Sequence, residues 1–168
     1  MKILRRLNEN LEMYLLMIFL VVMTMVMGMQ IFARYVLNSP LSWSEEVARF
    51  MFVWSGFVSV SYCIQKGIAI RIEQLVDFLP AKLRKAVDIS VTLILLAYFI
   101  YILPYAYDFF FRSVEAGQLA PATQIPMALI YAAPLTGFGL AIFRLFQNLL
   151  KDARSLFIDQ ESAKKEIE

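Results

Sequence analysis

Apolar residues fill four long stretches of the chain, and charged residues are confined to the segments between them. The stretches without a charged residue are 13–33, 50–65, 89–107 and 116–143. A helix needs about 20 apolar residues to cross the hydrocarbon core of a bilayer, because each residue adds roughly 1.5 Å along the axis. The pattern predicts an all-α integral membrane protein with four transmembrane helices in one membrane domain, residues 1–150. The expected spans lie at about residues 11–33, 43–65, 87–111 and 124–148.

Two further segments lie outside these spans. Between the second and third span, apolar residues recur on one helical stripe with polar residues off it, which is typical of a short amphipathic helix lying in the membrane interface. The apolar positions of this expected interfacial helix are Ile68, Ile72, Leu75 and Leu79. Residues 151–168 are rich in charge and are expected to form a cytoplasmic tail.

The composition supports a membrane protein and excludes several kinds of chemistry. Of the 168 residues, 60% are hydrophobic and only 18% are charged, which is too apolar for a soluble domain of this size. Cys63 is the only cysteine and histidine is absent. An internal disulfide and bis-histidine haem ligation are therefore excluded, and we expect no metal site, no cofactor, no nucleic-acid partner and no enzymatic activity.

Lysine and arginine are distributed unevenly between the two sides of the expected membrane domain. Thirteen of the sixteen lie in the N-terminal segment, the loop between the second and third span, and the C-terminal segment. By the positive-inside rule these three segments face the cytoplasm. We therefore expect a multi-pass membrane protein with both termini cytoplasmic.

The connector between the first two spans carries charges of both signs, and its last part is expected to start the second helix. Ser42 and Glu45 have the S-x-x-E spacing of a capping box, in which the serine hydroxyl accepts from a free backbone N–H and the glutamate reaches back. Glu46 and Arg49 then stand three residues apart, a spacing at which two side chains meet on one helix. The simplest interpretation is an ion pair at the membrane surface.

Two kinds of stripe on the spans suggest how the helices associate. Small residues every fourth position let another helix backbone approach closely, and we expect these to pack inside the subunit. They are Ser55, Ser59 and Cys63 in the second span and Ala133, Gly137 and Ala141 in the last. A bulkier stripe about opposite on the second span is expected to contact the helices of another protein, as the sharper alternative to a simple surface pair. This stripe comprises Trp43, Glu46, Arg49, Phe50, Val53, Trp54 and Phe57.

A chain that transports a solute by itself usually carries an ionisable residue or a broken, polar helix near the membrane midplane. None of the four expected spans has a central charge, and no inverted repeat is visible. The sequence therefore favours an auxiliary or scaffolding subunit. The alternative is a small self-sufficient transporter or channel built as a homo-oligomer.

The chain resembles the small membrane subunit of tripartite ATP-independent periplasmic (TRAP) transporters over nearly its whole length. The main similarity is an arginine, a loop, and then W-x-E-E-x-x-R leading to a tryptophan in the second helix. In this chain the pattern is carried by Arg34, Pro40, Trp43, Glu45, Glu46, Arg49 and Trp54. Further similar positions are Lys66-Gly67, Ile70, Phe78-Leu79-Pro80, Gln124-Ile125-Pro126 and Pro134. The chain departs from the family in having Ala69 where histidine is usual.

The resemblance implies a division of labour between three proteins. A large multi-spanning subunit, expected here as a separate chain, would carry the sodium and substrate sites. A periplasmic binding protein would deliver an organic acid such as a C4-dicarboxylate or a sialic acid. The small subunit would anchor the static scaffold of the large one among membrane lipids, and the resemblance places both in a bacterial inner (cytoplasmic) membrane.

Overall fold

A computed structural model of the chain describes residues 2–67 and 81–165, with side chains described for residues 10–67, 83 and 87–150. The described residues form long helices, namely α1 (Lys2–Tyr35), α2 (Ser42–Lys66), α4 (Ala81–Ala116) and α5 (Ala128–Lys165). Each has a segment long and apolar enough to cross a membrane: Asn10–Tyr35, Ser42–Lys66, Val87–Ala116 and Ala128–Leu150. The prediction of four helical spans is confirmed. The interfacial helix expected at Ile68, Ile72, Leu75 and Leu79 lies outside the described residues.

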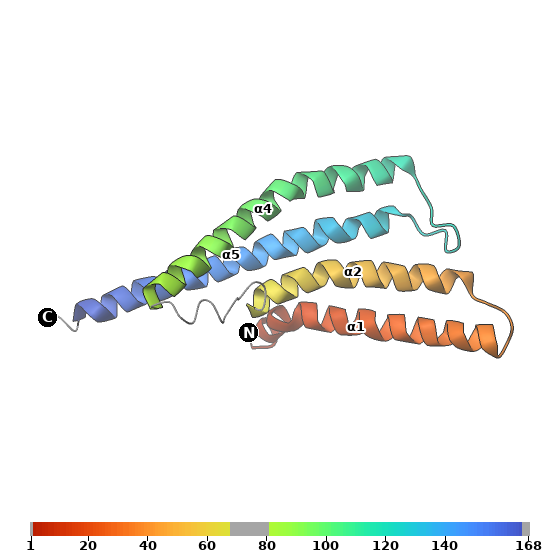
Figure 1. The fold of residues 1–168 in the computed structure, drawn as a ribbon, viewed down its shortest axis with the longest axis horizontal. Coiled ribbons are helices and arrows are strands. Elements are labelled where there is room, and N and C mark those ends of the chain that lie inside the picture. The colour runs from red at the N-terminus through yellow and green to blue at the C-terminus, as the bar shows by residue number, and fades with distance from the viewer. Residues whose placement is uncertain (1, 68–80, 166–168) are drawn as a thin grey trace.

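The helices lie side by side in one layer, in the order α1, α2, α5, α4 (Figure 1). Contacts join α1 to α2, α2 to α5 and α5 to α4. The central position of α2 and α5 is reflected in their burial, since 28% of the residues in the apolar window of each are buried, against 6% in α1 and in α4. The layer therefore leaves wide apolar surfaces open, which a membrane protein can cover with lipid or with another subunit.

The connections between the helices define two ends of the layer. The α1–α2 and α4–α5 connections lie at one end, here called the loop end, and the last turn of α2 lies at the other, here called the terminal end (Figure 1). Gly67 ends α2 with a φ of 67°, and its N–H donates to the Cys63 and Ile64 carbonyls. Gly117 follows α4 with a φ of 58°. Both positions need the left-handed backbone that glycine adopts at little cost.

The α4–α5 connection lies further along the chain than the sequence predicts, because α4 continues to Ala116 and α5 begins only at Ala128. Gln124, expected to begin the last span, has a φ of 57°, and Ala120 N–H donates to the Ile125 carbonyl at 2.9 Å. These residues form a compact turned loop, so α5 begins only at Ala128. At its other end α5 does not stop with the apolar span but continues to Lys165.

A tight contact between α2 and α5 holds the centre of the layer. A Cβ atom placed on Gly137 would lie 2.7 Å from the Phe57 Cβ and 2.9 Å from the Phe57 carbonyl oxygen. The Phe57 ring then meets the Phe138 ring edge to face, with centroids 5.5 Å apart. Glycine is required here because only its lack of a side chain lets the two helices come this close.

Candidate functional site

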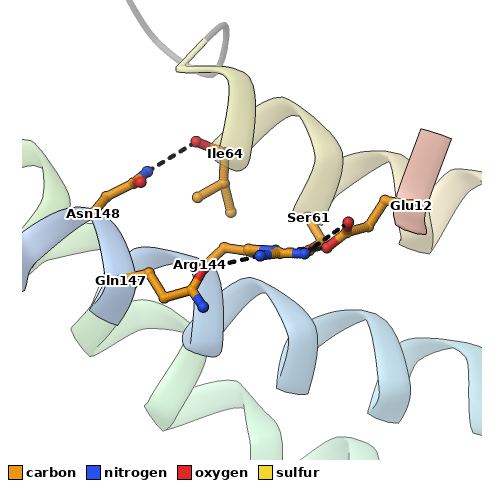
Figure 2. A network of polar contacts seen from close by, with 6 residues as sticks. All are labelled: Glu12, Ser61, Ile64, Arg144, Gln147 and Asn148. Atoms are coloured by element: carbon orange, nitrogen blue, oxygen red, sulfur yellow. Dashed lines mark hydrogen bonds and ion pairs between the residues drawn. The ribbon is translucent and has the colours of Figure 1, made fainter. Parts of the chain in front are cut away.

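A buried ion pair joins α1 to α5 near the terminal end of the layer. Arg144 Nε donates to Glu12 Oε1 at 2.6 Å and Arg144 Nη2 donates to Glu12 Oε2 at 2.8 Å, which makes the pair bidentate (Figure 2). The Glu12 and Arg144 side chains are 0% and 5% exposed. Ser61 of α2, also fully buried, donates its hydroxyl to Glu12 Oε1 at 3.3 Å. Three helices therefore converge on one carboxylate.

The polar network continues along α5 towards the last turn of α2. Arg144 Nη1 donates to Gln147 Oε1 at 2.9 Å, and Asn148 Nδ2 donates to the Ile64 carbonyl at 3.0 Å (Figure 2). The Ile64 carbonyl belongs to the last turn of α2 and also accepts from the Gly67 N–H that ends the helix. These contacts connect the last turn of α2 to α5. Within the network, the Glu12 and Arg144 charges neutralise each other.

The uncharged runs of the sequence do not predict this ion pair, because both of its residues lie just outside those runs. Glu12 stands immediately before the run 13–33, and Arg144 stands immediately after the run 116–143. Opposite charges at the borders of two spans, on the same side of the membrane, are a signal for such a pair. Because both Glu12 oxygens accept from Arg144, the network suits a structural clamp better than an ion or substrate site.

A second polar contact fastens the α4–α5 loop to α2 at the loop end. Glu46 Oε1 accepts from the Ala122 N–H at 2.9 Å. Its Oε2 accepts from the Thr123 N–H and from the Thr123 hydroxyl, each at 2.8 Å. We call this set of three hydrogen bonds the Glu46 latch. It gives Glu46 a role inside the chain that its position in the sequence did not reveal.

Removal of the Glu46 latch should release the α4–α5 loop. We expect Glu46→Ala to raise amide hydrogen exchange at Ala122 and Thr123, because both N–H groups lose a charged acceptor. Glu45→Ala is the matched control, since Glu45 Oε1 accepts from Gln30 Nε2 at 2.9 Å instead and leaves the loop untouched. Equal exchange rates in the two variants would contradict the latch.

The start of α2 differs from the capping box that the sequence predicts. The helix begins at Ser42, Leu41 takes the N-cap position, and this cap makes no side-chain hydrogen bond. Glu45 bonds to Gln30 of α1 instead of reaching back. The contact with α1 satisfies the carboxylate, so tertiary structure overrides the local cap.

Part of the bulky stripe of α2, expected to face another protein, is occupied by contacts within the chain. Phe50 is 5% exposed and is therefore not available to a partner. Trp54 Nε1 donates to the Leu129 carbonyl of α5 at 3.1 Å, and Phe57 packs on Phe138. Val53 is half-buried and Trp43 is 38% exposed. The reason lies in α5, where small residues opposite this stripe leave room for large side chains.

The small residues fall into two groups. Ala133 and Ala141 of α5 are 0% exposed and Gly137 is buried. Ser55, Ser59 and Cys63 of α2 are only half-buried. Gly56 beside them is exposed, with nothing within 4 Å of a Cβ placed on it. The small stripe of α2 is thus not fully covered by the rest of the chain.

A groove between α1 and α2 accounts for this exposure, and we call it the α1–α2 groove. Its two parts, of about 620 Å³ and about 280 Å³, share Met23. The larger part, nearer the loop end, is lined by Met23, Thr24, Met27, Gly28, Ile31, Ala48, Arg49 and Phe52. The smaller part is lined by Leu16, Phe19, Leu20, Met23, Met51, Ser55, Gly56 and Ser59.

The described residues include no group of three or more Cys, Asp or Glu side chains placed to hold a metal ion. The helices are joined at the terminal end by Glu12 and Arg144 and at the loop end by the Glu46 latch, and they leave the α1–α2 groove open. Such an arrangement can bind other membrane components.

Comparison with known proteins identifies the family. Residues 23–155 match the model of the DctQ component of tripartite ATP-independent periplasmic transporters. The chain is 30% identical over 112 residues to the isethionate TRAP transporter permease protein DctMQ of Oleidesulfovibrio alaskensis. The aligned region covers 67% of the chain and 18% of that protein.

Two relatives from Vibrio cholerae are smaller proteins. The C4-dicarboxylate TRAP transporter small permease protein DctQ is 25% identical, over 71% of the chain and 52% of its own length. The sialic acid TRAP transporter small permease protein SiaQ is 30% identical, over 57% of the chain and 56% of its own length. The chain therefore matches about half the length of these two relatives. The match over residues 23–155, with four helices that can span a membrane, shows that the chain belongs to the DctQ family of TRAP transporter small permease components.

Proposed function

We propose that the chain is the non-catalytic scaffold subunit of a TRAP-type secondary transporter that imports an organic acid. A large multi-spanning permease subunit binds it and carries the substrate and sodium sites, and a periplasmic binding protein delivers the substrate. The observation that carries the proposal is the family match over residues 23–155.

The polar contacts of the helices support a scaffold role. Glu12 and Arg144, the ion pair buried in the layer, satisfy each other in a bidentate contact. Glu46 is occupied by backbone and hydroxyl donors of the α4–α5 loop. A transport site needs polar groups that can exchange their partners for substrate or ion, and these groups already serve helix-to-helix and helix-to-loop contacts.

The names of the three relatives described above support an organic acid as the substrate. Isethionate, C4-dicarboxylates and sialic acid are the substrates in those names, and all are organic acids. The DctMQ relative is several times longer than the region it shares with this chain. This length is consistent with a small component that works beside a larger membrane part, which we place here on a separate chain.

The orientation follows from the charge distribution. Thirteen of the sixteen Lys and Arg residues lie in segments that the positive-inside rule assigns to the cytoplasmic side. We therefore place both termini in the cytoplasm and the loop end outside. In this orientation the α4–α5 loop, shaped by the Glu46 latch, faces the periplasmic binding protein.

Uptake in proteoliposomes tests the proposal. Vesicles would contain this chain, the large permease subunit of the same system, or both, with the binding protein outside and an inward sodium gradient. Labelled succinate and N-acetylneuraminate serve as probes of the two acid classes. We expect uptake of one of them only when both membrane chains are present. Solute movement by this chain alone would support the homo-oligomeric transporter instead.

A further inference from the structure

The α1–α2 groove contains a charged side chain, Arg49, to which the described residues offer no hydrogen bond. Arg49 lines the larger part of the groove and is exposed. It lies seven residues into α2, so its Cα is roughly 10 Å along the helix from Ser42. Glu46 lies near enough to act on Arg49 electrostatically, but its oxygens accept from Ala122 and Thr123. Among the described residues, the Arg49 guanidinium makes no hydrogen bond, so a negative side chain of another helix would stabilise it next to the apolar part of the span.

The walls of the groove have the space that a helix backbone needs. Gly28 on α1 and Gly56 on α2 are both exposed, and a Cβ placed on either would meet nothing within 4 Å. Small residues on both walls allow a third helix to approach the backbones closely. The lining runs along α1 from Leu16 to Ile31, which is roughly 22 Å at 1.5 Å per residue.

We propose that the α1–α2 groove docks one transmembrane helix of the large permease subunit, with an acidic side chain of that helix paired to Arg49. The inference rests on the proposed function, since it requires a large subunit. Of the bulky stripe of α2, it keeps Arg49 as a contact and leaves out Phe50, which is buried, and Phe57, which packs on α5. Phe52, 67% exposed, lines the groove together with Arg49. The ion pair with Arg49 sets the position of the docked helix along the groove. The small residues of the groove walls set its distance from α1 and α2.

Side chains that fill the groove should block docking without destabilising the fold of the chain. Gly28→Leu and Gly56→Leu each place a side chain in open space, and leucine favours helix more than glycine does. Gly139→Leu is the matched control, because Gly139 is also exposed with nothing within 4 Å of a Cβ but lies on α5, outside the groove. The thermal unfolding temperature of each isolated variant in detergent should be no lower than that of the wild type.

The test is co-purification of each tagged variant with the large subunit in mild detergent, with bound phospholipid measured by native mass spectrometry. We expect Gly28→Leu and Gly56→Leu to reduce the recovered large subunit by roughly tenfold, and Gly139→Leu to leave it unchanged. Arg49→Glu should reduce it as well, with Arg49→Lys retaining more complex because it keeps the positive charge.

The possible failures are distinguishable. If wild-type chain recovers no large subunit, the proposed function is wrong. If the wild type and all three leucine variants recover equal amounts of the large subunit, the proposed docking site is wrong and the proposed function stands. If the groove variants keep the complex but lose a bound phospholipid, the groove holds lipid, which also overturns the inference.

Discussion

Replacing Arg144 by methionine is expected to destabilise the chain by about 3–5 kcal/mol, because it breaks a buried ion pair from one side only. The variant leaves the Glu12 carboxylate, 0% exposed, without the guanidinium that it contacts at 2.6 and 2.8 Å. Ser61 would remain as a donor, but one hydroxyl does not replace a bidentate cation. The free energy of unfolding can be measured by SDS titration in mixed micelles, followed by circular dichroism.

Two comparisons make the Arg144 result specific. The double variant Glu12→Met with Arg144→Met removes both charges and should recover most of the lost stability, because an apolar pair of similar volume needs no charge partner. Arg112→Met is the matched control, since Arg112 lies exposed on α4. A single Arg144→Met variant as stable as Arg112→Met would mean that the buried ion pair does not form.

Replacing Gly137 by alanine is expected to cost about 1–3 kcal/mol, because the added methyl group overlaps Phe57. The overlap involves the Phe57 backbone as well as its Cβ, at 2.9 and 2.7 Å, so a change of side-chain rotamer cannot relieve it. The α2–α5 contact at the centre of the layer would have to open. Thermal unfolding in detergent is a suitable measurement.

Gly139→Ala provides the contrast within the same helix. Gly139 is exposed and a Cβ there meets nothing within 4 Å. Alanine at this position should be neutral or should stabilise α5 by up to about 1 kcal/mol, through its higher helix propensity. If the two alanine variants unfolded at the same temperature, the close approach of α2 and α5 at Gly137 would be refuted.

The four spans could be predicted from the sequence because hydropathy and length decide them locally. The order of the helices in the layer could not, since it depends on which surfaces fit each other. The second span illustrates the difficulty. Its small and bulky stripes were assigned to the inside and the outside of the subunit by residue size alone, whereas Phe57 turns inward because Gly137 of α5 gives it room.

The polar contacts were predictable in part. Glu46 stood out as a charged residue inside the second helix, but its partners lie 76 and 77 residues away in the α4–α5 loop. Glu12 and Arg144, 132 residues apart, border their spans and resemble ordinary flanking charges. Contacts over such sequence distances depend on the fold, so a single sequence gives at most the candidates for pairing.

The central claim is that this chain works as one half of a membrane complex, and co-purification tests it most directly. The tagged chain would be expressed with the large permease subunit of its system and isolated in mild detergent. We predict a stable one-to-one complex, with the stoichiometry measured by native mass spectrometry. If the tagged chain instead purified as a defined homo-oligomer that contained no co-expressed large subunit, this result would contradict the account.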